Sequence, residues 1–401
     1  KFSPAHRSQG LAELICSNSL KAARIESAAG LLKEEMRRLG SLLVPIAERC
    51  AVPAGGALAV DREEFSRLAT QAVESHPLIE LRREELERIP DGTAVIATGP
   101  LTGGGMAEDI RAMCGGGLSF FDAAAPIVTR ESVNMDRCFE ASRYDRGGGD
   151  YINCPMNKEE YERFHAELLN AQRAHLHEFD RDQKVYEGCM PIEVLAGRGR
   201  DAIRYGPMKP VGLIDPRTGH RPWAVLQLRM ENREGSLYNL VGFQTNLKFS
   251  EQRRVFGLIP GLENAEFVRY GVMHRNTFLN SPRLLEGDFS LRGRPGLYFA
   301  GQMTGVEGYM ESAASGLMAG RNAARRLCGK EPMILPRETM IGALSRYVFG
   351  YEGKDFQPMG ANFGILPPLE ERIRDKRLRY EELSKRALKA LDAAIDQERG
   401  A

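Results

Sequence analysis

The segment from Gly296 to Tyr309 constrains the fold more than any other part of this chain. Its sequence predicts a buried strand, a glycine-rich turn and the start of a helix that continues from Met310 to Leu327. Small residues recur along that helix and allow it to pack closely against a sheet. Its first turn can direct backbone N–H groups at a phosphate or at the edge of an electron-rich ring. The segment therefore predicts a layered α/β fold with a ligand-binding crevice at the end of a strand.

A similar strand end occurs earlier in the chain. Residues 94–97 predict a short strand that is followed at once by Thr98 and Gly99. A glycine at this place lets the backbone approach a flat ligand closely, because glycine has no side chain. The stretch between the two strand ends is rich in β-forming runs and contains one long predicted helix over about 158–179. We therefore expect an inserted mixed domain in the middle of the chain.

Other local patterns give further expectations. Apolar residues at helical spacing predict a helix from about Ser17 to Cys50, with a break near Gly30. Asp61 is the expected N-cap of a second helix, because Glu64 follows three residues later. Residues 79–86 are a candidate strand, and a final helix is expected over about 369–399.

Composition excludes several classes of protein. The 401 residues carry 55 basic and 54 acidic side chains, so the chain lacks the strong basic excess that is typical of nucleic-acid-binding proteins. No apolar run approaches the roughly 20 residues of a membrane-spanning helix. The seven cysteines are odd in number and lack metal-type spacing, and no secretory leader precedes them. We expect a cytoplasmic protein with reduced thiols, no disulfides and no metal site.

Two of these cysteines are candidates for reactive thiols. Cys16 and Cys189 each stand just ahead of a predicted helix start, with Ser17 or Asn18 as caps in the first case and Pro191 in the first turn of the second. The unpaired N–H groups at a helix start stabilise thiolate over thiol. Position alone favours the alternative that both are small buried apolar residues.

These features resemble those of one family, the bacterial folate- and FAD-dependent tRNA (uracil-54-C5-)-methyltransferases. The matching stretches are distributed over nearly all of the chain, and the most specific of them are residues 206–213 and 270–277. The others are residues 14–20, 53–65, 97–102, 121–128, 150–156, 187–193, 241–245, 298–320 and 356–359.

The resemblance implies both an architecture and a reaction. The implied fold is α/β, with a glutathione-reductase-like, three-layer FAD/NAD(P)-binding domain at 1–101 and 268–330, an inserted α+β domain at 102–267 and a largely helical C-terminal segment at 331–401. The implied reaction methylates uracil C5 at position 54 in the T-loop of tRNA. The methylene group comes from 5,10-methylenetetrahydrofolate, and its electrons come from reduced FAD, which NADPH or NADH regenerates.

The resemblance also implies site residues. Cys189 corresponds to the nucleophile that adds to uracil C6, and Cys16 corresponds to the second thiol, for proton removal at C5 or methylene transfer, although the two could exchange roles. His274 and Asn276 correspond to folate contacts. The implied FAD contacts are Thr98, Gly99, Gly301, Gln302, Gly305, Val306, Gly308 and Tyr309.

One departure from the family keeps alternatives open. Family members begin with a strand, a Gly-x-Gly-x-x-Gly turn and a helix that hold the FAD pyrophosphate, and this sequence starts after them, so the expectations refer to the intact gene product. The sister flavoproteins that modify the tRNA wobble uridine are one alternative, although those chains are longer. The other is a tRNA-binding or tRNA-folding protein without catalysis.

Overall fold

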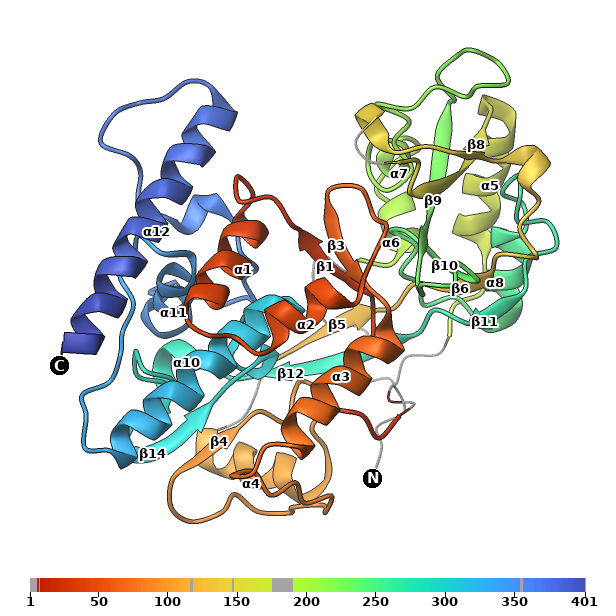
Figure 1. Ribbon diagram of the computed structural model, residues 1–401. Coiled ribbons are helices and arrows are strands. Elements are labelled where there is room, and N and C mark those ends of the chain that lie inside the picture. Colours follow the sequence, from red (N-terminus) through yellow and green to blue (C-terminus); the bar gives the residue numbers. More distant parts are fainter. Residues whose placement is uncertain are drawn as a thin grey trace.

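The computed structural model describes residue 6 and residues 8–115, 118–145, 148–174, 190–353 and 356–400, with the backbone alone at 118–123, 274–277 and 399–400. Two large hydrophobic cores divide this part of the chain into two lobes. One core is built from two separate stretches, 14–114 and 279–391. The other lies within residues 128–265. We call the two parts the discontinuous lobe and the insertion lobe; they lie on the left and the right of Figure 1.

The discontinuous lobe is mainly helical around two small sheets. In one sheet β14 pairs in parallel with β4 and antiparallel with β13, and the other has the order β1-β3-β2. Its elements are β1 (Ser19–Ala22), α1 (Ala28–Arg38), α2 (Leu43–Arg49), β2 (Ala51–Val52), β3 (Ala57–Val60), α3 (Arg62–Glu74), β4 (Ala94–Ile96), α4 (Gly104–Cys114), α9 (Ser281–Leu284), β13 (Ser290–Leu291), β14 (Arg294–Phe299), α10 (Tyr309–Leu327), α11 (Met340–Gly350) and α12 (Lys376–Gly400).

The predicted strand, turn and helix around Gly301 are all present. β14 ends at Phe299, and α10 begins at Tyr309 and packs on β14 through its small buried residues, among them Ala314 and Ala319. Gly316 and Gly320 do not take part, because a side chain at either position would meet nothing within 4 Å. The close packing of helix on sheet therefore comes from the alanine face of α10.

The insertion lobe is built on an antiparallel sheet of six strands in the order β11-β6-β10-β9-β8-β7. Helices α5 and α8 cover it, and the rings of Phe164, Phe243 and Phe256 pack together beneath them. Its elements are β6 (Ile127–Thr129), β7 (Phe139–Glu140), β8 (Tyr151–Met156), α5 (Lys158–Asn170), α6 (Ile192–Ala196), α7 (Ala202–Tyr205), β9 (Ala224–Met230), β10 (Leu237–Leu240), α8 (Phe249–Phe256) and β11 (Phe267–Arg269).

A two-stranded antiparallel ribbon connects the lobes. It consists of β5 (Leu118–Ala123) and β12 (Met273–Phe278), which pair along their whole length from Met273 opposite Ala123 to Phe278 opposite Leu118. The ribbon runs across the centre of the molecule toward the insertion lobe (Figure 1). The chain therefore leaves the discontinuous lobe and returns to it side by side, as an inserted domain requires.

Four local predictions are wrong. Gly30 does not interrupt the first helical stretch, because it lies buried inside α1, and the break falls between Arg38 and Leu43. The helix expected over 158–179 ends at Asn170, because Ala171 has an extended backbone.

The chain forms no helix from Ser17 to Ala22, because Ser19 pairs with Ala59 of β3 and Lys21 has a left-handed backbone with φ 65°. Residues 79–86 form no strand, because five of the eight are charged, four of them in a row from 82 to 85, and Ile79 and Leu86 are exposed, so the segment has no apolar face to bury. By contrast, the Asp61 cap of α3 is confirmed, since its carboxylate accepts the N–H of Glu64 at 3.0 Å.

The C-terminal helices belong to the core of the discontinuous lobe. α12 packs against α1, with Leu383, Ala387 and Leu391 buried in the shared core. α11 is fixed to α1 by Glu35, whose carboxylate accepts the N–H groups of Met340 and Ile341 at 2.7 and 2.8 Å. No helix in the described ranges is both long and apolar enough to span a lipid bilayer.

Glu35 gives the fold a predictable dependence on pH. Burial raises the pKa of this carboxyl from 4.5 to about 7, although its two backbone hydrogen bonds oppose the rise. The folded state therefore holds the Glu35 proton more tightly than the unfolded state does. The resulting contribution to the free energy of unfolding is fully present below pH 4.5, the ordinary pKa of the unfolded chain. It is lost as the pH rises through 7, and the total loss is roughly 3 kcal/mol. We expect the wild type to lose stability relative to Glu35→Gln between pH 4.5 and pH 8 in urea titrations.

Glu63→Gln, at an exposed position of α3, is the matched control and should follow the wild type at every pH. Parallel stability curves for wild type and Glu35→Gln would contradict the prediction.

Candidate functional site

The carboxyl ends of β4 and β14 form one edge of the sheet. The two strands are parallel, with Ile96 opposite Phe299, and the N–H of Ala300 donates to Ile96 O at 2.9 Å. Gly99 and Gly301 follow these ends with φ of 80° each, and a side chain at either position would meet nothing within 4 Å. The edge is thus open beside two backbone segments, where ligands of α/β sheets bind.

The turn from Gly301 to Gly308 is held in a fixed shape above this edge. The N–H of Gly301 donates to Ser315 Oγ at 2.7 Å, and Gln302 Nε2 donates to Glu307 Oε2 at 2.7 Å. Gly308 precedes α10 with φ 125°, where a side chain would collide with Glu311, and no side chain caps the first N–H groups of the helix. These N–H groups are therefore available to a ligand at the open edge.

The predicted residues at this edge lie in two adjoining groups. Thr98 and Gly99 follow β4, and Thr102 Oγ1 donates to Thr98 Oγ1 at 2.7 Å. The remaining members lie in the turn or at the start of α10: Gly301, Gln302, Gly305, Val306, Gly308 and Tyr309. The open backbone and the uncapped helix start fit a flat ring system that carries hydrogen-bond acceptors along one edge.

Cys16 reaches this turn from the other end of the sequence. Its backbone N–H donates to the hydroxyl oxygen of Tyr309 at 2.8 Å, and its Sγ lies 3.1 Å from the same oxygen. Burial raises the pKa of the Tyr309 phenol well above its ordinary value, and the neighbouring Cys16 adds to the rise. The phenol therefore keeps its proton at neutral pH and can donate it in a hydrogen bond to the sulfur.

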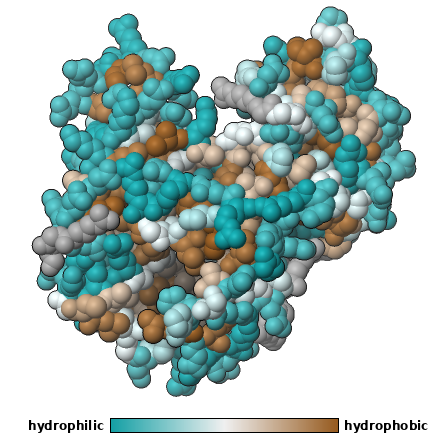
Figure 2. Space-filling model, viewed as in Figure 1, coloured by the Kyte–Doolittle hydropathy of each residue, from teal (hydrophilic) through white to brown (hydrophobic). Residues whose placement is uncertain are grey.

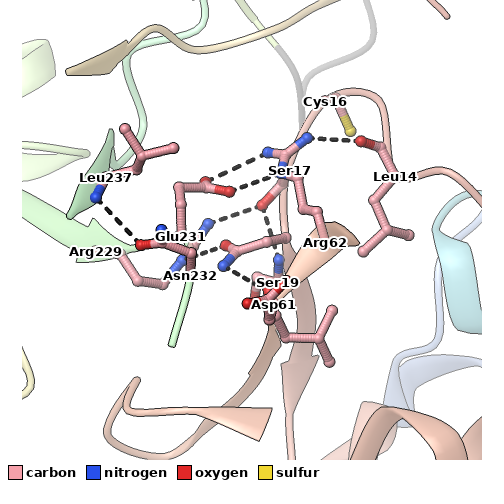
Figure 3. A network of polar contacts seen from close by, with 12 residues as sticks. Leu14, Cys16, Ser17, Ser19, Asp61, Arg62, Arg229, Glu231, Asn232 and Leu237 are labelled. Atoms are coloured by element: carbon pink, nitrogen blue, oxygen red, sulfur yellow. Dashed lines mark hydrogen bonds and ion pairs between the residues drawn. The ribbon is translucent and has the colours of Figure 1, made fainter. Parts of the chain in front are cut away.

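Two arginines hold the segment around Cys16, as Figure 3 shows. Arg62 donates to the carbonyl oxygens of Leu14 and Ile15 at 2.6 and 3.1 Å and pairs with Glu231 through both carboxylate oxygens. Arg229 is buried. It donates to the side chains that follow Cys16 in the chain, Ser17 Oγ and Asn18 Oδ1, at 2.8 and 3.0 Å.

This geometry corrects the reason for expecting a reactive thiol at Cys16. No helix begins at Ser17 or Asn18; the next element is β1, so the N–H groups of a following helix do not act on Cys16. Two guanidinium groups act instead. For Arg62, burial lowers the pKa, but the interactions with Glu231, Tyr309 and Cys16 are together stronger and raise it above its ordinary value. For Arg229, burial dominates and lowers the pKa, although the interaction with Cys16 opposes this change. Nearby cations favour a thiolate.

The sequence reasoning missed the insertion-lobe half of this network. Gln227, Arg229 and Glu231 alternate with apolar residues along and just after β9, and all three are buried. Alternation of this kind normally marks a strand face that is open to water. The signal was thus present in the sequence, but only the docking of the other lobe turns this face into a buried site.

Three predicted site residues are not tested by the geometry. Cys189 lies outside the described residues, one position before Met190. His274 and Asn276 are on β12, opposite Asp122 and Phe120 of β5, where the backbone alone is described. A helix does begin near the expected place after Cys189, since α6 starts at Ile192 with Pro191 as its N-cap.

A large cleft lies beside the Cys16 segment, between α3 and the insertion lobe. Its volume is about 1310 Å³, and its lining includes Leu14, Arg62 and Glu231. Seven carboxylates and three arginines line it, so its walls repel a polyanion. In the described part of the chain, no cluster of three or more His, Cys, Asp or Glu side chains is arranged to hold a metal ion.

Comparisons with known proteins agree with this geometry. A family model described as GIDA, glucose inhibited division protein A, matches residues 4–331. The methylenetetrahydrofolate–tRNA-(uracil-5-)-methyltransferase TrmFO of Desulfitobacterium hafniense (strain Y51) is 60% identical over 394 residues, which are 98% of this chain and 90% of that protein. The protein of the same name from Acetivibrio thermocellus is 57% identical over 399 residues, 99% of this chain and 91% of that protein.

Solved structures support the fold. Two crystal forms of Aquifex aeolicus GidA match with a TM-score of 0.68 at 16% identity, over 95% and 96% of this chain and 67% and 70% of the GidA chain. This likeness concerns the fold alone and confirms the predicted α/β class. The identity to the two methyltransferases extends over nearly the whole sequence, as the resemblance led us to expect. The chain therefore belongs to the GIDA family and, within it, to the methylenetetrahydrofolate–tRNA-(uracil-5-)-methyltransferases.

Proposed function

We propose that this protein methylates C5 of uracil 54 in the T-loop of tRNA, in the cytoplasm. The one-carbon unit comes from 5,10-methylenetetrahydrofolate, and the enzyme uses FAD, which NADPH or NADH reduces. The observation that carries this conclusion is the 60% identity over 98% of the chain to a methyltransferase of that name. The same identity supports methylation over wobble-uridine modification and over a non-catalytic tRNA-binding role.

The sheet edge is the place that fits FAD. Its open glycines, Gly99 and Gly301, and the uncapped N–H groups at the start of α10 suit the edge of a flavin ring, which carries carbonyl oxygens and a ring N–H. Thr98, Gln302, Gly305, Val306, Gly308 and Tyr309 complete the proposed contacts. Bound there, the reduced cofactor supplies the electrons that convert a methylene group to a methyl group.

Two thiols carry the chemistry on uracil. C5 of uracil is a weak nucleophile, and addition of a thiolate to C6 converts the ring to an enolate whose C5 attacks the activated methylene group. Cys189 is the proposed nucleophile at C6. Cys16 removes the C5 proton or assists methylene transfer, and the hydroxyl group of Tyr309, 3.1 Å from its sulfur, holds a proton beside it. The two cysteines could exchange roles.

The folate and the domain boundaries complete the proposal. His274 and Asn276 are proposed to contact the pterin ring by stacking and amide hydrogen bonds. Residues 1–101 and 268–330 form the FAD-binding domain, residues 102–267 the insertion and residues 331–401 the C-terminal segment. The two separate hydrophobic cores support the division between the FAD-binding domain and the insertion, while α4 and the C-terminal helices share the core of the discontinuous lobe.

The reaction is tested directly with the intact gene product. Incubation with unmodified tRNA, methylenetetrahydrofolate, FAD and NADPH should give 5-methyluridine, detected by mass spectrometry after digestion. We expect Cys16→Ala and Cys189→Ala to lower the yield at least a hundredfold, because a nucleophile or its partner is lost. Cys328→Ala, at an exposed cysteine after α10, is the control and should retain activity. Absence of product from FAD-loaded wild type would remove the assignment.

Tyr309 is expected to control how readily Cys16 ionises. Tyr309→Phe removes the hydroxyl group beside the sulfur, so the thiolate loses one hydrogen bond to a charged group, roughly 1.5 kcal/mol. The midpoint of the pH dependence of Cys16 alkylation by iodoacetamide should therefore rise by about one pH unit. Peptide mass spectrometry resolves Cys16 from the exposed Cys328, whose alkylation is the internal reference and should not change. An unchanged midpoint at Cys16 would show that the phenol does not act on the thiol.

A further inference from the structure

Tyr144 stands out among the surface residues of the insertion lobe. It lies in a tight turn between β7 and β8, its side chain is 60% exposed, and its backbone has φ 58°. A bulky residue in the left-handed region is an outlier that costs free energy, and such residues concentrate at functional sites. Burial does not account for it, because most of this side chain remains in solvent.

The structure holds the ring in one place. The N–H of Tyr144 donates to Gly212 O at 3.0 Å, and Arg143 Nη1 donates to Val211 O at 2.8 Å. A side-chain carbon built on Gly212 would lie 3.1 Å from three atoms of the Tyr144 ring. The ring therefore rests against the bare backbone of Gly212, in a segment where Val211 and Ile214 are 40% and 57% exposed.

This surface is connected to the catalytic thiol through β9. Arg143 Nε donates to Gln227 Oε1 at 2.8 Å, while Arg229, two residues further along the same face of β9, holds Ser17 next to Cys16. Two residues of a strand span about 7 Å. The Tyr144 turn and the Cys16 segment are thus anchored to neighbouring positions of one strand face.

The chemistry of this surface differs from that of the cleft beside the Cys16 segment. The cleft carries seven carboxylates, whereas Tyr144 rests on a segment with the exposed apolar residues Val211 and Ile214, and Arg143 precedes it in the chain. In Figure 2, apolar residues interrupt the hydrophilic surface at the top of this lobe. An unstacked RNA base can stack on an aromatic face that is exposed to solvent in this way.

We propose that Tyr144 is a stacking platform for an unstacked base of the RNA loop that carries the target uridine. The proposal rests on the proposed function and names the place where the RNA loop is held. An enzyme that acts on C5 and C6 of a base must take that base out of its stack, which leaves its neighbours without a partner. A rigidly held ring, anchored to the same strand as the Cys16 segment, replaces the lost stacking without reading sequence.

The test uses the FAD-loaded protein and a stem-loop RNA of T-arm sequence, with 2-aminopurine replacing a loop base beside the target uridine. Stacking on the ring should quench its fluorescence in wild type and in Tyr144→Phe. We expect Tyr144→Ala to abolish the quenching and to raise both Kd and KM about tenfold, with kcat within twofold of wild type. Gly212→Ala, which places a methyl group 3.1 Å from the ring at a backbone φ of 81°, should shift the ring and weaken the quenching and the affinity without deleting the ring.

Phe249→Ala is the matched control, because Phe249 is 52% exposed on α8 of the same lobe. It should behave as wild type in quenching, Kd and KM. Wild-type quenching and affinity in both Tyr144→Ala and Gly212→Ala would overturn the stacking platform while methylation stands. Quenching that depends on Tyr144 in a protein that makes no 5-methyluridine would instead remove the proposed function and keep the platform.

Discussion

The site depends on two arginines, one from each lobe, that each bind residues of the opposite lobe. Arg62 belongs to the discontinuous lobe and pairs with Glu231 of the insertion lobe, while Arg229 belongs to the insertion lobe and binds Ser17 and Asn18 of the discontinuous lobe. Removing one member would leave a partner charge buried without compensation, which costs far more than an exposed ion pair contributes. The segment that carries Cys16 therefore has its observed shape only when the lobes are docked.

This dependence gives the proposed reactive thiol at Cys16 an environment that does not require a helix dipole. A helix start would act on Cys16 whatever the insertion lobe did. The guanidinium groups of Arg62 and Arg229 interact electrostatically with Cys16 only in the assembled molecule, where the hydroxyl group of Tyr309 also lies 3.1 Å from the sulfur. Because Tyr309 is the first residue of α10, the same helix start that leaves N–H groups without a side-chain cap also sets the position of the hydroxyl group beside the thiol.

The sequence predicts those features that depend on interactions between neighbouring residues, and it fails where residues distant in sequence determine the structure. Asp61 and the strand, turn and helix around Gly301 were found because capping, buried strands and glycine turns are set by neighbours in the sequence. The helix expected after Ser17 was wrong because Asn18 donates to Val60 O and Met230 O, which are distant in sequence and override local propensity. Arg62 and Arg229 were missed because each gains its role from a partner in the other lobe, which the alternation along β9 does not reveal.

The polar face of β9 connects these observations. Side chains on one face of a strand recur every second residue, so Gln227, Arg229 and Glu231 lie in a row about 7 Å apart. The row fixes the Tyr144 turn at one end, the Cys16 segment in the middle and Arg62 at the other end. A slip of one residue in the pairing of β9 would turn the whole row to the opposite face and separate all three at once. The register of a single strand thus sets the spacing between the thiol and the surface that we assign to the RNA base.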